Sequence, residues 1–148
     1  MNNKELFKKT ESMLYNYSML KAEIDNLELE LEELDNEYEG IGAMVYEERS
    51  GATNKISDSV ANEIIFKEKE VYKLNKIKRS KEILLTKINN ALEALDESER
   101  KIVHYRYLSS KRTWMQVSEI LSMDSNYCCN TLRVNIINKL SKMIFPKR

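Results

Sequence analysis

The stretch MLYNYSMLKAEIDNLELELEELDNEY, residues 13–38, decides the fold of the N-terminal half of the chain. Its apolar residues recur at strictly alternating intervals of four and three positions. They are Met13, Tyr17, Leu20, Ile24, Leu27, Leu31, Leu34 and Tyr38. This alternation is the heptad seam of a coiled coil, whereas a helix on a globular core usually carries a wider apolar stripe. The stretch therefore predicts a long helix that requires a helical partner.

Residues 57–97 are the candidate for that partner. Ser57 or Asp58 is the expected N-cap. The apolar line, which changes phase near residues 74–78, consists of Val60, Ile64, Val71, Leu74, Ile77, Leu84, Leu85, Ile88, Leu92 and Leu95. The simplest arrangement folds this helix back antiparallel on the first one. Periodicity equally allows pairing between chains, so a homodimer through the coiled coil is an open alternative.

A connector, residues 39–56, separates the two helical stretches and contains all three glycines of the protein, Gly40, Gly42 and Gly51. The helical period stops here. A phosphate-binding loop would need a GxGxxG pattern or a Gly-Lys-Ser/Thr sequence, and the connector has neither. We therefore predict an ordered connector within an N-terminal domain, residues 1–91, that forms an antiparallel coiled-coil hairpin.

Charge is distributed unevenly along a chain whose formal net charge is zero. Residues 1–50 carry 5 basic and 13 acidic side chains, a net charge of −8, and residues 51–97 carry 9 and 8, a net charge of +1. Residues 98–148 carry 10 and 3, a net charge of +7. Because a basic segment attracts phosphate and an acidic one repels it, nucleic-acid binding is expected at the C-terminal end. The basic run within residues 73–81 is more typical of a solvated helix face.

The composition excludes several classes of protein. With 3 Gly and 1 Pro among 148 residues, it favours an all-α fold over a sandwich or barrel. No apolar run approaches 18 residues, so no membrane span is expected. The N-terminus lacks the pattern of a secretion signal, and the expected location is the cytoplasm.

The reactive side chains do not form a recognisable catalytic or metal-binding pattern. Cys128 and Cys129 are adjacent, and neither a second cysteine pair nor a histidine cluster accompanies them. We predict reduced thiols, with Cys129 as a small core residue. His104 is the only histidine, so no catalytic triad or Cys/His pair can be drawn. The protein is predicted to be no enzyme and to need no cofactor.

The C-terminal domain, residues 92–148, reads as three helices. Asp96 or Ser98 is the N-cap of the first, whose apolar face is Ile102, Val103, Tyr105 (or Arg106) and Leu108. Thr113 starts the second with a capping box to Gln116. The side chains expected to pack inward from this helix are Trp114, Val117, Ile120 and Leu121.

A polar corner, residues 122–124, leads to the last helix, which begins at Ser125 or Asp124. Its expected inward stripe is Cys129, Leu132, Ile136 and Leu140, and its outward face is Tyr127, Asn130, Thr131, Val134 and Asn138. A helix, a short turn and a second helix form the geometry of the helix-turn-helix. The last helix is thus predicted to enter the major groove of double-stranded DNA.

Different side chains of this domain are suited to different parts of DNA. The helix N-termini at Thr113 and Ser125 offer unpaired N–H groups to phosphate. Asn126 and Asn130 carry the amides that read adenine, and Tyr127 reaches a phosphate or a thymine methyl. The complete predicted set is Lys111, Arg112, Thr113, Gln116, Ser125, Asn126, Tyr127, Asn130, Thr131 and Arg133.

The segments LEALDESERKIVHYRYL, TWMQVSEILSM and NTLRVNIINKL resemble region 4 of bacterial sigma factors. The matching residues are Leu92, Leu95, Glu99, Arg100, Thr113, Val117, Ile136, Ile137, Lys139 and Leu140. The chain as a whole resembles sigma-like regulators of phages and prophages of Gram-positive bacteria, near the ArpU and RinA groups. The resemblance implies control of late, packaging or lysis genes, with host RNA polymerase as a partner.

The sequence also departs from complete sigma factors. Ser122 replaces the usual glycine of the turn, and no region that melts DNA is present. An activator or DNA-binding adaptor therefore fits better than a sigma factor. Two alternatives remain: a small terminase subunit that binds DNA at a packaging site, and a protein-interaction module that does not bind DNA.

Overall fold

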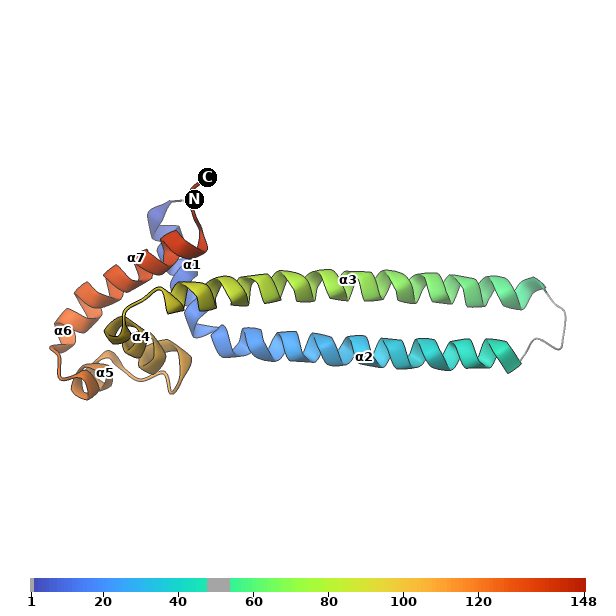
Figure 1. Cartoon of the computed structure of the whole chain (residues 1–148), viewed down its shortest axis with the longest axis horizontal. Coiled ribbons are helices and arrows are strands. Elements are labelled where there is room, and N and C mark those ends of the chain that lie inside the picture. The colour runs from blue at the N-terminus through green and yellow to red at the C-terminus, as the bar shows by residue number, and fades with distance from the viewer. Residues whose placement is uncertain (1, 48–53) are drawn as a thin grey trace. The chain divides into compact units, whose positions relative to one another are not determined.

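A computed structural model describes residues 2–47 and 54–148, and it describes side chains for 2–37 and 59–148. The long helices are α1 (Asn3–Tyr15), α2 (Tyr17–Glu47) and α3 (Asn54–Glu93). The C-terminal elements are α4 (Glu97–Val103), the π-helical turn η1 (His104–Leu108), α5 (Trp114–Leu121), α6 (Ser125–Tyr127), the π-helical turn η2 (Cys128–Leu132) and α7 (Arg133–Ile144) (Figure 1). Within the described ranges every regular element is helical, which confirms the all-α class.

The chain forms two compact units that differ from the expected division at residue 91. One unit combines Met1–Lys21 with Ile83–Arg148, and the other is Ala22–Glu82. The difference arises because α1 contacts α7 and η1. Leu14, in α1, is completely buried. Such burial is typical of an apolar side chain that forms part of a hydrophobic core. The N-terminal helix therefore belongs to the same unit as the C-terminal helices.

The Ala22–Glu82 unit consists of parts of α2 and α3, which run side by side in opposite directions (Figure 1). Ion pairs join Glu23 to Lys81 at 2.6 Å, Glu28 to Lys78 at 3.6 Å and Glu37 to Lys67 at 3.4 Å. The residue numbers rise along α2 as they fall along α3, so the two helices are antiparallel. In α2 the predicted seam positions, Ile24, Leu27, Leu31 and Leu34, are buried or half-buried, while the other residues between 22 and 37 are exposed.

Helix α3 meets α2 with a line of residues that sequence reasoning placed partly wrong. Ile77 was expected on this line, but its side chain is 44% exposed. The half-buried positions instead continue the intervals of four and three through three lysines. These positions are Val60, Ile64, Lys67, Val71, Leu74, Lys78 and Lys81. The lysine stems cover apolar surface while their ammonium groups pair with the glutamates of α2, which explains why lysine is tolerated there.

Two helix boundaries also differ from expectation. Helix α2 continues to Glu47, through Gly40 and Gly42, because each glycine costs a helix only about 1 kcal/mol relative to alanine and good helix formers surround them. Helix α3 already begins at Asn54, so Ser57 and Asp58 lie inside it. The predicted connector 39–56 is therefore helical up to residue 47 and from residue 54 onward, and Gly51 lies outside the described residues.

The helix predicted to start at Met13 is also interrupted, between α1 and α2, at Asn16. The backbone of Asn16 leaves the helical region, with φ −95° and ψ 10°. Asparagine competes with helix formation through its short polar side chain, which gives a local reason for the break. The interruption lets α1 belong to one unit and most of α2 to the other.

The core of the Met1–Lys21 and Ile83–Arg148 unit is apolar. Its buried hydrophobic residues are Leu14, Leu20, Ile88, Ala91, Leu95, Ile102, Val103, Tyr107, Val117, Cys128, Ile136, Ile137, Leu140 and Ile144. No helix in the described residues is long and apolar enough to cross a membrane.

Two π-helical turns shift the expected core. Tyr107 is buried, whereas Tyr105 (or Arg106) and Leu108, predicted on the apolar face, are only half-buried. Cys128 is likewise buried, whereas Cys129, the predicted core residue, is only half-buried. A π turn holds one residue more than an α turn, so the side chain that faces the core changes by one position. On α5, Val117 is buried as predicted, whereas Ile120 is 43% exposed.

Candidate nucleic-acid interface

Helix α5 begins with the capping box that the sequence predicts. The Thr113 hydroxyl accepts the backbone N–H of Gln116 at 3.2 Å, and the Gln116 side chain accepts the backbone N–H of Thr113 at 3.0 Å. These two bonds satisfy two N–H groups at the start of the helix. Both residues are exposed, so their outer surfaces are available to a ligand, although the cap already uses part of their hydrogen-bonding capacity.

The corner between α5 and α6 is built from one left-handed residue and one acidic cap. Ser122 has φ 54° and ψ 45°, a conformation in which a glycine is more usual. The backbone N–H of Met123 then bonds to the Ser118 carbonyl at 2.9 Å. Asp124 is the N-cap of α6, since its carboxylate accepts the Tyr127 N–H at 3.0 Å. Of the two expected starting residues, Ser125 is therefore the first helical residue, and Asp124 is its N-cap.

Residues 125–144 form one helical segment with a buried and an exposed side. The π turn closes through a hydrogen bond from the Arg133 N–H to the Cys128 carbonyl, five residues back. The core side carries Cys128, Ile136, Ile137, Leu140 and Ile144. The exposed side carries Asn126, Tyr127, Asn130, Thr131, Val134 and Asn138, so every side chain predicted to face outward does so. We call residues 126, 127, 130 and 131 the reading face.

The two cations before α5 are in different situations. Lys111 is exposed and has a left-handed backbone, with φ 47°. Arg112 is half-buried, because its guanidinium lies 5.1 Å from the centre of the Tyr105 ring and its Nε donates to the Ser110 hydroxyl at 2.9 Å. Arg112 and Gln116 line one shallow hollow beside α5. This hollow brings together two of the predicted site residues.

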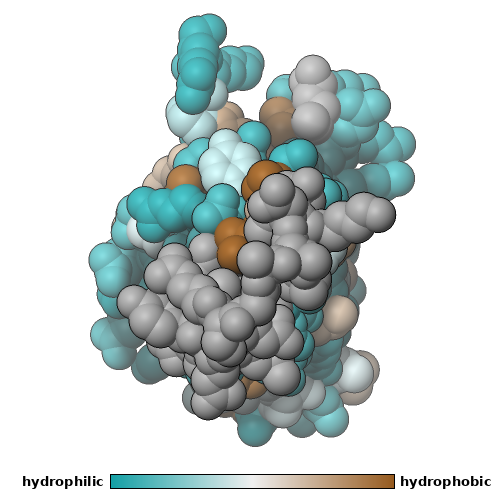
Figure 2. All heavy atoms as spheres, turned by 90° about the vertical axis from the view of Figure 1, so that its right-hand side faces the viewer, coloured by the Kyte–Doolittle hydropathy of each residue, from teal (hydrophilic) through white to brown (hydrophobic). Residues whose placement is uncertain are grey.

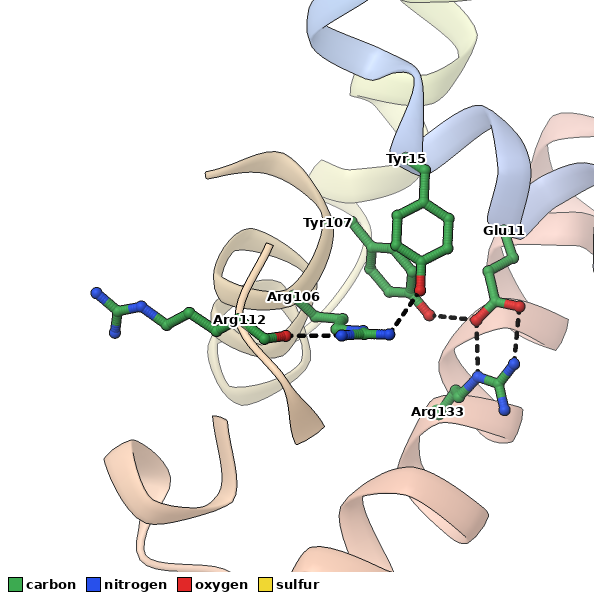
Figure 3. Close-up of polar contacts among 6 residues, drawn as sticks. All are labelled: Glu11, Tyr15, Arg106, Tyr107, Arg112 and Arg133. Atoms are coloured by element: carbon green, nitrogen blue, oxygen red, sulfur yellow. Dashed lines mark hydrogen bonds and ion pairs between the residues drawn. The ribbon is translucent and has the colours of Figure 1, made fainter. Parts of the chain in front are cut away.

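Arg133, one of the predicted DNA contacts, forms an ion pair with Glu11. Its Nε and one terminal nitrogen donate to the two carboxylate oxygens of Glu11 at 2.7 and 2.8 Å (Figure 3). The Tyr107 hydroxyl donates to the same carboxylate at 2.7 Å. A two-pronged arginine–carboxylate pair is strong and neutralises the charge of both groups. Arg133 therefore joins α1 to the start of α7, and the ion pair leaves it less charge to offer to a phosphate.

The surroundings of Glu11 change the ionisation of both members of the pair. Hydrogen bonding to Arg133 lowers the pKa of Glu11 below its ordinary value of 4.5, against the opposing effect of burial. The same hydrogen bond raises the pKa of Arg133. Burial, followed by the bond to Glu11, raises the pKa of the Tyr107 hydroxyl. The three groups therefore keep their charge states throughout the neutral range.

A second arginine packs between aromatic rings next to this pair. The guanidinium of Arg106 lies 5.1 Å from the Trp114 ring centre and 5.6 Å from that of Tyr15. It donates to the Arg112 carbonyl at 2.8 Å and to the Tyr15 hydroxyl at 2.9 Å (Figure 3). Arg106 thereby ties the loop before α5 to α1. Sequence reasoning missed Glu11, Tyr15 and Arg106, because partners 91 to 122 positions apart leave no local pattern.

Among the described residues, no group of three or more His, Cys, Asp or Glu side chains is placed to hold a metal ion. Cys128 is buried, which raises the pKa of its thiol, and both cysteines are free. His104 is exposed and makes an edge contact with the Tyr105 ring at 5.6 Å.

The fold and this face define an all-helical protein with an exposed polar helix face beside a tight corner. Over residues 6–142 the chain matches the family described as "Protein of unknown function (DUF722)", and the chain belongs to that family. Neither the curated proteins nor the solved structures contain a significant match.

Proposed function

We propose that the protein is a sequence-specific DNA-binding transcription regulator, in which α5, the corner and residues 125–144 act as a helix-turn-helix. The observation that carries the proposal is the reading face. Asn126, Tyr127, Asn130 and Thr131 are exposed while the opposite side of the same segment packs in the core. Amide, hydroxyl and aromatic side chains of this kind match base edges and thymine methyl groups in the major groove.

Electrostatics supports binding by this part of the chain. The net charge of +7 over residues 98–148 favours the phosphate backbone, which supplies much of the affinity of DNA-binding proteins. With Arg133 engaged by Glu11, the cations available near α5 are Lys111 and the partly tethered Arg112. Asp124 adds a negative charge next to the reading face, which disfavours contact with a phosphate at that point.

The resemblance of the chain to sigma-like regulators of phages and prophages narrows the proposed role to the control of late, packaging or lysis genes. In this proposal the antiparallel pair of long helices is a coiled-coil hairpin, and the protein acts with host RNA polymerase in the bacterial cytoplasm. A gel shift with the protein's own upstream DNA tests the proposal against a protein-interaction module that does not bind DNA. Ring oligomerisation together with binding at a packaging site would instead support the alternative of a terminase subunit.

The affinity for DNA is expected to fall steeply with salt. Each phosphate neutralised by a protein cation contributes about −0.9 to the slope of log K against log salt, so several contacts give a slope of several units. Fluorescence anisotropy with a labelled duplex between low and physiological salt measures this slope. A flat response, or no binding to any duplex at low salt, would contradict DNA binding and favour a protein-interaction module.

Asn130→Ala is expected to weaken specific binding by roughly 1–3 kcal/mol and to relax the preference at one base pair, because an amide pair to adenine is lost. The melting temperature should stay nearly unchanged, since Asn130 is exposed. Asn90→Ala is the matched control, because Asn90 is also exposed on a helix but lies outside the reading face. If substitutions of Asn126, Tyr127 and Asn130 all left affinity and base preference intact, this face would not read DNA.

A further inference from the structure

Helix α3 of the Ala22–Glu82 unit directs lysines towards α2 and several large apolar side chains away from it. The side chains of Lys67 and Lys78 are 14% and 19% exposed. Ile65, Phe66 and Tyr72 are 49%, 64% and 69% exposed. Apolar surface gathered on one stretch of helix marks an interaction surface more often than single scattered residues do. The outer side of α3 therefore has the character of a contact surface.

Part of this outer side is arranged as a stripe. Ile65, Lys69, Tyr72 and Lys76 follow one another at intervals of four, three and four, which places them on one face of the helix. All four are exposed. The ammonium groups of Lys69 and Lys76 make no ion pair within the part of the chain that the structure describes. We call these four residues the basic stripe.

Helix α2 carries the opposite pattern on its own outer side. Asp25, Leu29, Glu32 and Asn36 have the same intervals of four, three and four, and all four are exposed. Leu29 is 57% exposed. The carboxylates of Asp25 and Glu32 likewise make no ion pair among the described residues. We call these four residues the acidic stripe.

Hydrophilic side chains predominate on the coloured surface in Figure 2, with isolated hydrophobic ones between them.

We propose that the protein self-associates through these stripes, with the basic stripe of one copy bound to the acidic stripe of a second copy. The charged residues are seven positions apart in both stripes, 69 and 76 in one and 25 and 32 in the other, so the two spacings match along paired helices. The contact would cover Ile65, Tyr72 and Leu29. It does not depend on DNA binding and goes beyond the proposed regulatory function.

Charge complementarity identifies a second copy as the occupant. The chain itself carries the surface that complements the basic stripe. Pairing of two basic stripes would bring Lys69 and Lys76 of both copies together, and like charges at an interface are strongly unfavourable. A phosphate backbone would neutralise the lysines but would leave Ile65 and Tyr72 uncovered, and the acidic stripe would repel it.

The test is a charge exchange in the full-length protein, followed by sedimentation velocity. Wild type should associate. Lys69→Glu/Lys76→Glu should be weakened about tenfold or more, and so should Asp25→Lys/Glu32→Lys, because each double change creates like charges across the contact. An equimolar mixture of the two variants should associate again, since both contacts between unlike variants join opposite charges. The fourfold variant that carries all these changes should also self-associate.

Glu30→Lys is the matched control for Glu32→Lys. Both residues are exposed, and two positions along a helix separate their directions by about 200°. Glu30→Lys should associate like wild type, and circular dichroism should show unchanged helicity in every variant. A wild-type protein that is monomeric at its highest soluble concentration would overturn the proposal. Double variants that associate like wild type would also overturn it. The same holds if the mixture and the fourfold variant both remain helical but do not associate.

Discussion

Leu14→Ala is expected to lower the free energy of unfolding of the Met1–Lys21 and Ile83–Arg148 unit by roughly 2–5 kcal/mol. Leu14 is completely buried, and the helix that carries it contacts α7 and η1. Its truncation removes apolar contact and leaves a cavity between the N-terminal helix and the C-terminal helices. Trp114, the only tryptophan, lies in the same unit, so its fluorescence during urea unfolding measures this loss.

Met19→Ala is the matched control for this substitution. Met19 lies in the same unit but is 57% exposed, so its truncation should change stability by no more than about 0.5 kcal/mol. Equal effects of the two substitutions would show that α1 does not share the C-terminal core. For the same reason a fragment of residues 92–148, which lacks Leu14, should be much less stable than the full chain.

Glu11→Gln is expected to cost about 2–4 kcal/mol of stability, the second largest effect. The substitution keeps the size of the side chain but removes the charge that accepts two hydrogen bonds from Arg133 and one from Tyr107. Hydrogen bonds to charged groups are worth about 1.5–3 kcal/mol each, and partial exposure of Arg133 reduces the total. Urea unfolding at neutral pH measures the difference.

The effect of Glu11→Gln should also depend on pH. Because the folded pKa of Glu11 lies below 4.5, the carboxylate stabilises the fold fully above that value, and this contribution is lost as the pH falls through the lowered folded pKa. The difference between wild type and variant should therefore shrink in acid. Glu97→Gln, at a strongly exposed ion pair with Lys101, is the control and should be near neutral. A difference that stayed constant down to the acid limit would exclude ionised Glu11 as the cause.

Local patterns were read correctly where a single helix face decides them. The intervals of Ile24, Leu27 and Leu31 identified the side of α2 that meets its neighbour, and Thr113 with Gln116 identified the start of α5. Both are properties of residues within four positions of each other. The apolar face of one helix and the hydrogen bonds of its capping box do not depend on the rest of the fold. Sequence alone was therefore sufficient to predict both.

The π-helical turns mark the first limit of such reading. A period of 3.6 residues predicts Cys129 in the core, but one extra residue in the turn Cys128–Leu132 brings Cys128 there instead. Lys67 and Lys78 mark a second limit, since a hydrophobic pattern does not predict lysines on the line that faces α2. They are stable there because Glu37 and Glu28 lie opposite.

The sequence by itself determined the helical class, the seam of α2, the capped start of α5 and the outward side of the last helix, because each follows from periodicity or from a local hydrogen bond. Only the tertiary structure decided that α1 joins the C-terminal unit and that Arg133 binds Glu11. The pair spans 122 positions, and any of the exposed acids could have matched Arg133 by charge alone. Helix α1, which carries Glu11, contacts both η1 and α7, and this packing brings Glu11 within reach of Arg133.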